Sequence, residues 1–586
     1  RLNFFRLVAS TIFQMKNPNL IVYYFEITNL AKRLVNFKNL KKSEQKKVLQ
    51  INLRSTFRKD KLGNNLRYKT EELTWQIVRD YLANKQLGVE EYRAEEDSWK
   101  RMVQSFYVTR IREKTELFFL LRNFLSLFES KVEKIIIFDL FPLFESWEKN
   151  MPTSQYLSVQ ARWSFRWSLF PILVIGYVAF EWLRAFLVRP PPSTNLVSSD
   201  KRAKVFEEYI TNIFTRYPQA GHLFWYPKSG ISPERVVLYF DRKEDINVSR
   251  EVIGEIEKHK FSWIEMLKKS QFRLEGKSLL KVIKGIVTSK KINKSWLELY
   301  AVQLYLIFSV EWYRNILRKN NVKVVHQHQE FWPNTLALAL ATKIEQGIFV
   351  WNHWSVDHYP ISYYNCGFAD LVFSWGAYND GYFNSHDFKY TYMVQTGLIA
   401  GENVEPSDKE LGKRIRDKFS RKVDYVITVL DSSHNDIHID TPTEKIIECY
   451  KETFDLIIKN KNRGIIIHSK GSAFEKIKSL GEIQRPLRKL IAEKRCILDE
   501  IGSRVVPSCI AADICVSFTI NSAGFLAGLA GKRSVHWDIS GELFHPLYQL
   551  KLDKNIVFKS FKEIKKELDQ FEREKTALGD HENGYL

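Results

Sequence analysis

Cysteine is scarce in this chain, which holds five cysteines among 586 residues. No two of them form a CxxC pair, and no zinc-binding spacing of Cys and His is present. Disulfide-rich secreted scaffolds and structural zinc domains are therefore excluded. We expect the cysteines to be reduced thiols inside hydrophobic cores, which favours a cytosolic protein.

Long uncharged apolar runs are also rare. The most apolar run, residues 167–180, would extend about 21 Å as a helix, whereas the hydrocarbon core of a bilayer is about 30 Å thick. Pro171 and Gly176 weaken a helix there. Tryptophan and arginine flank the run, as they do at the headgroup level of membranes. We expect residues 161–192 to form an interfacial or re-entrant segment and a Pro-rich linker, with a buried helix between domains as the alternative.

The GxxxxGK[ST] pattern of P-loop proteins is absent, as are internal repeats and recognisable RNA- or DNA-binding modules. The chain is nevertheless basic, with a formal net charge of +21. Residues 31–70 hold thirteen Lys or Arg against two Asp or Glu. Such a surface suits nucleic acid or an anionic membrane, and a solubilising face is the alternative. Because no nucleic-acid module is found, we expect an anionic membrane surface as partner and no nucleic acid.

The composition, 45% hydrophobic and 14% aromatic, is that of a folded protein, and 586 residues exceed what one core holds. After residue 192, short apolar runs alternate with helical patterns, which is typical of parallel sheets covered by helices. We predict an α/β protein with two tandem Rossmann-like domains and a helical, membrane-associating N-terminal elaboration. The predicted units are residues 1–160, a mixed helical region with part of the first sheet; 161–192, the apolar segment and linker; 193–400, the first Rossmann-like domain; and 401–586, the second.

Apolar runs bounded by turn residues mark the expected strands. In the first domain they are residues 236–240, 322–327, 348–351, 371–375 and 393–397, with helices at 296–319 and 334–346. In the second domain they are residues 425–430, 465–468, 504–507, 514–520, 534–537 and 555–558, with a helix at 562–575. Residues 20–25 and 134–139 are candidate strands of the N-terminal region, and residues 397–419 are an expected polar connector.

Residues 514–538 have the pattern strand, turn, helix, turn, strand. Asn521 and Ser522 are favourable N-cap residues for the helix in this pattern. The backbone N–H groups and the dipole at a helix N-terminus favour an anion, and the Gly and Ala that follow permit close approach of a ligand. We predict that a phosphate group binds at Ser522, with an ordinary strand–helix–strand unit as the alternative.

Two more polar turns follow strands of the second domain. His468, Ser469 and Lys470 form one turn, in which Lys470 can neutralise phosphate charge. Asp431 and Ser432 begin the other turn and offer polar side chains and backbone amides. The carboxyl ends of parallel strands meet at one edge of a sheet. The three turns together therefore predict a nucleotide-type ligand, although each alone also fits an ordinary polar turn.

Histidines and acids follow two strands of the first domain. His326, His328 and Glu330 follow one strand, and His353 and Asp357 follow the next. His326 and His328 are two residues apart, so their side chains share one face of the strand. We predict that the first three residues bind substrate, unless the histidines only cap loops, and that His353 or Asp357 deprotonates an attacking hydroxyl. A metal site would require a third ligand that the sequence does not identify, so we expect no metal.

Several strings resemble the GT-B glycosyltransferases of bacterial surface polysaccharide synthesis. In the first domain they are IFVWNHW, ADLVFSWGAYNDGYF and YMVQTG, and in the second, similar to the nucleotide-sugar half of those enzymes, they are YVITVLDSS, GIIIHSKG and ADICVSFTINSAGFLAGLAGKRSVHWD. The resemblance covers residues 320–560. The His and Ser of the second domain are similar to those of transferases that use CMP-activated Kdo or sialic acid. Ser469 follows His468 here, where those enzymes have proline.

The resemblance implies a glycosyltransferase that moves a sugar from a nucleotide-activated donor to a glycan or lipid-linked acceptor. It implies that residues 193–400 receive the acceptor and that residues 401–586 bind the nucleotide sugar. No cofactor is expected, and no metal, because the helix dipole and Lys470 would stabilise the departing phosphate. The expected location is the cytoplasmic face of the inner membrane, as a peripheral or monotopic protein. A UDP-sugar 2-epimerase, a polyol-phosphate transferase and a non-enzymatic basic membrane- or nucleic-acid-binding protein are the alternatives.

Overall fold

The structure is a computed structural model of the chain. Apart from a few single residues, it describes residues 22–24, 48–50, 66–83, 94–109, 134–140, 158–163, 203–208, 229–240, 250–265, 294–328, 331–352, 365–376, 387–398, 406–432, 443–470, 473–499, 504–539, 546–548 and 555–574.

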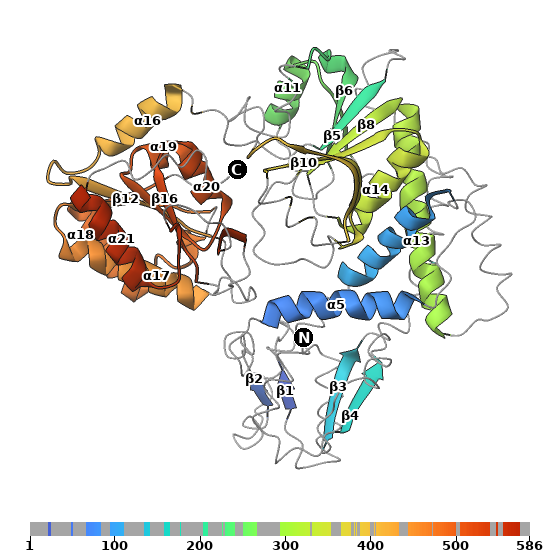
Figure 1. The fold of residues 1–586 in the computed structure, drawn as a ribbon, viewed down its shortest axis with the longest axis horizontal. Helices are drawn as coiled ribbons and strands as arrows, with labels where there is room; N and C mark the ends of the chain where they lie inside the picture. Colours follow the sequence, from blue (N-terminus) through green and yellow to red (C-terminus); the bar gives the residue numbers. More distant parts are fainter. Residues whose placement is uncertain are drawn as a thin grey trace.

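The first domain is built on a parallel sheet of seven strands (Figure 1). In sheet order the strands are β11 (Lys389–Gln395), β10 (Phe368–Ser374), β9 (Ile348–Asn352), β8 (Val322–Gln327), β5 (Lys204–Glu208), β6 (Val236–Phe240) and β7 (Ser262–Glu265). Helices α13 (Lys294–Lys319) and α14 (Pro333–Ile344) pack on each other and on β8, and α11 (Arg250–Lys258) packs on β7. Apolar side chains of these elements form the core of this domain.

The described N-terminal helices join this core. Helix α5 (Leu66–Ala83) and a helix over residues 96–109 contribute buried side chains to it. The hydroxyl of Ser105 donates a hydrogen bond of 2.6 Å to the carbonyl oxygen of Phe331. Arg101 donates to the carbonyl oxygens of Asn365 and Asp387, at 3.0 and 2.5 Å. These contacts between residues far apart in the sequence fix the N-terminal helices on the first domain.

The second domain is built on a parallel sheet of six strands (Figure 1). In sheet order the strands are β14 (Cys496–Leu498), β13 (Arg463–His468), β12 (Tyr425–Leu430), β15 (Ile514–Phe518), β16 (Arg533–Trp537) and β17 (Val557–Phe558). The helices of this domain are α16 (Pro406–Arg416), α17 (Thr443–Lys459), α18 (Gly481–Ala492), α19 (Val505–Ile510), α20 (Ser522–Leu529) and α21 (Phe561–Glu574). Every residue of β12, β15 and β16 is buried, as expected for central parallel strands.

Strand order reverses once in each sheet. In the first sheet the chain runs outward from β5 to β7 and then returns to begin β8 beside β5. In the second it runs outward from β12 to β14 and returns to begin β15 beside β12. At such a reversal, the loops that follow two neighbouring strands lead away in opposite directions along the sheet. Ligands of parallel α/β sheets bind in the crevice between these loops, at the carboxyl ends of the two strands. The fold therefore singles out the ends of β5 and β8 and the ends of β12 and β15.

An apolar cluster joins elements of both domains. Trp375 follows β10, and its ring lies 6.2 Å from the ring of Phe525 on α20. Leu398 and Ile520 belong to the same cluster. The carboxyl-end loops of the first sheet therefore contact the helix that follows β15.

The expected α/β class is confirmed, since both large sheets are parallel and packed with helices. The free cysteines are also confirmed, and all five are buried. The strand predicted at 504–507 is wrong, because this segment opens helix α19. Pro507 lies in the first turn of that helix, where its missing N–H has no consequence. The connector predicted at 397–419 contains a helix, α16.

The N-terminal strands form sheets of their own. The run at 20–25 contains β1 (Val22–Tyr24), and the run at 134–139 lies within β3 (Lys134–Leu140). Strand β1 pairs with β2 (Val48–Gln50), and β3 pairs with β4 (Ser158–Trp163). In the described part of residues 1–160, then, the expected share in the first sheet is absent, and the contribution to the first domain is helical.

Among the described residues, no helix is long and apolar enough to cross a membrane. The apolar run at 167–180 lies outside the described residues, apart from Gly176, so its interfacial placement stays a prediction.

Candidate functional site

Asp431 stands directly after β12, at the reversal of the second sheet. One oxygen of its buried carboxylate accepts a hydrogen bond of 2.8 Å from the hydroxyl of Tyr450 on α17. The other accepts 2.6 Å from the backbone N–H of Lys470, in the turn after β13. Burial, together with the charge of Asp431, raises the pKa of Tyr450, which keeps its hydroxyl protonated and able to donate. Asp431 thus joins the ends of two neighbouring strands.

Ser432 connects the same edge to the loop after β15. Its hydroxyl donates 2.9 Å to the carbonyl oxygen of Phe518 and lies 2.7 Å from the hydroxyl oxygen of Thr519. The side-chain amide of Asn521 donates to it at 3.2 Å. Thr519 has a φ of 73°, a conformation that costs a non-glycine residue about 1–3 kcal/mol. Two hydrogen bonds anchor Thr519 in that conformation: its hydroxyl with Ser432, and its backbone N–H with the carbonyl oxygen of Trp537 at 2.8 Å.

Asn521 caps α20, as the sequence predicts. Its side-chain oxygen accepts the backbone N–H of Gly524 at 3.1 Å and the hydroxyl of Ser517 at 3.1 Å. Gly524 is required here, because a β-carbon at this position would lie 2.4 Å from the ring of His536 and 2.6 Å from the hydroxyl oxygen of Ser517. Small residues therefore let α20 approach the sheet, and Ser522 becomes the first residue of its N-terminal turn.

In the predicted turn after β13, the side chains of His468 and Ser469 contact other residues of the same domain. His468 lies with its Nδ1 atom 2.7 Å from a carboxylate oxygen of Asp499. The hydroxyl oxygen of Ser469 accepts the backbone N–H of Phe474 at 2.9 Å. Lys470 is exposed when the whole residue is considered. Protein atoms around its ammonium group nevertheless partly desolvate it, and this desolvation lowers the pKa of Lys470. Among these three residues, only Lys470 is exposed.

The second-domain cluster, defined as Asp431, Ser432, Lys470, Thr519 and Asn521, therefore gathers the three polar turns at one sheet edge. Hydrogen bonds link Asp431 to Lys470 and Ser432 to Thr519 and Asn521. Ser522 stands at the N-terminus of α20, beside Asn521. An N-terminal helical turn can bind a phosphate group, and a cation at the same edge of the sheet adds to the attraction.

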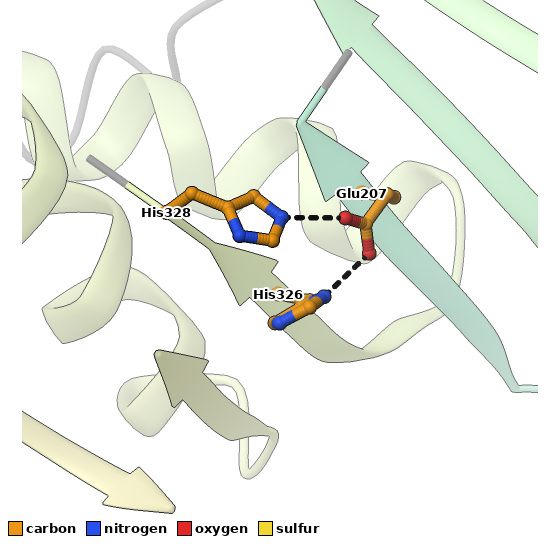
Figure 2. Close-up of side chains that lie close together, drawn as sticks. All are labelled: Glu207, His326 and His328. Carbon is orange, nitrogen blue, oxygen red and sulfur yellow. Dashed lines mark hydrogen bonds and ion pairs between the residues drawn. The ribbon is translucent and has the colours of Figure 1, made fainter. Parts of the chain in front are cut away.

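A second cluster lies at the reversal of the first sheet (Figure 2). The His–Glu–His cluster consists of Glu207 at the end of β5 and of His326 and His328 at the end of β8. One oxygen of Glu207 lies 2.8 Å from Nδ1 of His326, and the other lies 2.9 Å from Nε2 of His328. The two imidazole rings are 4.4 Å apart. All three side chains are buried.

Glu207 is a candidate that the sequence analysis did not identify. Strand β5 has the sequence KVFEE, whose two acids obscure the apolar pattern of a buried strand. Its partner histidines are 119 and 121 residues later, so no local spacing reveals the contact. Glu330, His353 and Asp357 lie outside the described residues, and the roles predicted for them stay predictions.

No protein-family model and no curated protein matches the chain. Among solved structures it is similar to a glycosyltransferase from Rickettsia africae, with 12% identity over 66% of this chain and 93% of that chain and a TM-score of 0.39. It is similar to HepE from Anabaena in complex with UDP-glucose, at 11% identity, 66% and 93% coverage and a TM-score of 0.36. It is also similar to UDP-GlcNAc 2-epimerase from Methanocaldococcus jannaschii, at 11% identity, 63% and 91% coverage and a TM-score of 0.36. Similarity at this level assigns no activity to the chain.

Proposed function

We propose that this protein is a glycosyltransferase of GT-B-like architecture that moves a sugar from a nucleotide-activated donor to a glycan or lipid-linked acceptor. The observation that carries the proposal is the second-domain cluster. It gathers three polar turns at the reversal of a parallel sheet, next to the N-terminus of α20. Ligands of such sheets bind at this position.

A phosphate-bearing donor suits this edge for electrostatic reasons. The first turn of α20 presents backbone N–H groups, and its dipole favours negative charge. Lys470 supplies a cation at the end of β13, on the other side of β12 from β15 and α20. As the bond between sugar and phosphate breaks, charge accumulates on the phosphate, and these groups would stabilise it. The leaving group therefore needs no metal ion in the second domain.

Asp431 has a positioning role in this proposal. Both of its carboxylate oxygens accept hydrogen bonds from protein groups, Tyr450 and Lys470. It therefore holds the turn after β13 against the end of β12, and Lys470 with it. The base that deprotonates the acceptor is predicted to be His353 or Asp357. The acceptor, the membrane surface and the location at the inner membrane rest on residues 31–70 and 161–192, most of which lie outside the described residues.

A thermal-shift panel of CMP, UDP, GDP and CDP tests the donor site on the full chain. One nucleotide should raise the melting temperature, and the rise should shrink in Ser522→Ala and Lys470→Ala. Absence of a shift with all four nucleotides would contradict the proposal. Incubation of the protein with UDP-GlcNAc and no acceptor separates the transferase from a 2-epimerase, which would convert the sugar nucleotide under those conditions.

A further inference from the structure

The His–Glu–His cluster is positioned by the register of two paired strands. Glu207 on β5 and His326 on β8 are direct partners across the parallel pair, and both strands lie in the interior of the sheet. His328 is two residues beyond His326, so its side chain leaves the chain on the same side. The sheet therefore holds the three polar side chains together without a flexible loop between them (Figure 2).

The cluster is almost completely shielded from bulk solvent. The Glu207 side chain is 0% exposed, that of His326 is 3% exposed and that of His328 is 1% exposed. A carboxylate in such a place needs positive charge close to it. A divalent cation bound between the Glu207 carboxylate and the two imidazole nitrogens would supply this charge.

We propose that Glu207, His326 and His328 bind a divalent transition-metal ion of the zinc type. One ligand atom from each of the three residues lies within 4.8 Å of the other two. The two nitrogen-to-oxygen distances are 2.8 and 2.9 Å. A metal with bonds of about 2.1 Å places its neighbouring ligand atoms roughly 3.0–3.4 Å apart. Small rotations of these side chains therefore exchange the hydrogen bonds for metal bonds.

The donor set selects the class of ion. Two imidazoles and one carboxylate suit zinc, iron and related transition metals, whereas magnesium and calcium prefer sites made of oxygen atoms. Three protein ligands also leave at least one position for water or for an oxygen of a bound molecule. This site is on the first sheet, away from the proposed nucleotide cluster. The proposed site therefore replaces the expectation that the protein binds no metal. The departing phosphate would still be stabilised by the second domain and not by this metal.

Elemental analysis of the full-length protein, purified without chelators, tests the site. About one equivalent of a transition metal per chain is expected. In His326→Ala and His328→Ala the affinity for Zn²⁺ should fall by more than roughly 100-fold. A loss of that size exceeds the loss caused by replacing a residue that only orients a metal ligand through a hydrogen bond. Glu207→Gln keeps the size of the side chain and removes its charge, and it should also lose the metal. The matched control is His536→Gln, which alters an equally buried histidine in the second domain and should leave the metal content unchanged.

A measurement on the wild-type protein keeps the test independent of variant folding. After removal of metal with a chelator, Co²⁺ should produce visible absorption bands that saturate at one equivalent, and Zn²⁺ should abolish them and raise the melting temperature. The proposal is overturned if folded wild-type protein contains no transition metal and binds neither ion. The cluster would then be a hydrogen-bonded network of one carboxylate and two imidazoles.

Discussion

The carboxylate of Asp431 accepts the backbone N–H of Lys470 at 2.6 Å, although the two residues are 39 positions apart. The contact joins the residue after β12 to the turn after β13. It means that the position of Lys470 depends on a carboxylate from the neighbouring strand end. The cation proposed to face the donor phosphate is therefore fixed by the sheet and not by its own turn alone.

Replacing Asp431 with alanine should weaken nucleotide binding about tenfold, which corresponds to about 1.4 kcal/mol. Alanine removes both acceptors, so the Lys470 turn is released. Asp431→Asn should recover most of the affinity, because its carbonyl oxygen still accepts from Lys470 and its amide can donate to Tyr450. Calorimetric titration with the nucleotide identified by the thermal-shift panel measures both variants.

Asp455→Ala is the control for this series, since Asp455 is an exposed acid on α17 in the same domain. It should bind nucleotide like the wild type. If Asp431→Asn binds as weakly as Asp431→Ala while both are folded, the negative charge itself contacts the ligand, and the positioning role is wrong.

Tyr450→Phe should lower the free energy of unfolding by about 1–2 kcal/mol. The variant removes the hydroxyl that donates to Asp431 and leaves a buried carboxylate oxygen without this donor. Burial and the charge of Asp431 raise the pKa of Tyr450, so the loss should be the same throughout the neutral range. Urea denaturation measures it. Tyr392→Phe, at a side chain that is 68% exposed, is the matched control and should change nothing. Equal stability of both variants would contradict the prediction.

The second-domain cluster could be predicted because its signals are local. An apolar run, the cap residues Asn521 and Ser522 and a segment of small residues follow one another directly in the sequence, and the structure has them as β15, the N-cap and α20. The links between the three turns could not be predicted. Asp431 contacts Lys470, and Ser432 contacts Thr519, although the partners are far apart in the sequence. Only the order of the strands in the sheet brings them together.

The first-domain site shows the opposite case. His326 and His328 stand out in the sequence, but their partner Glu207 comes from a strand with two acids at its end. Pattern alone does not identify such a strand, and without β5 the reversal of the sheet could not be placed. The failure at residues 504–507 has a different origin, because a short apolar run fits a strand or the first turns of a buried helix.

Gly524→Ala should destabilise the second domain by about 1–3 kcal/mol. The added methyl group would lie 2.4 Å from the ring of His536, on a rigid strand, so α20 must move away from the sheet. Nucleotide binding should weaken together with stability, because the N-terminus of α20 moves. Gly481→Ala is the control, since a β-carbon there meets nothing within 4 Å. Thermal and urea unfolding compare the two, and unchanged stability of Gly524→Ala would show that the helix is not held by this contact.

Glu345 follows α14 and accepts hydrogen bonds from Arg314 and Arg318 of α13. Desolvation by itself raises the pKa of Glu345, but the two guanidinium groups outweigh it and leave the pKa below its ordinary value of 4.5. A carboxyl group whose pKa is lower in the folded protein stabilises that state above its unfolded pKa, and the effect disappears as the pH falls through the folded value.

Glu345→Gln should therefore be less stable than the wild type at pH 7, and the difference should shrink steadily below the ordinary pKa of 4.5. As the pH falls below 4.5 the unfolded chain takes up a proton at this position more readily than the folded protein, so the stabilisation by the ion pairs with Arg314 and Arg318 is progressively lost. Urea denaturation of both proteins between pH 3 and pH 7 measures the difference. Glu410→Gln, in an exposed pair with Arg414, is the control and should show no comparable dependence on pH. A difference that stays constant down to pH 3 would mean that Glu345 stabilises the α13–α14 contact through packing and not through its charge.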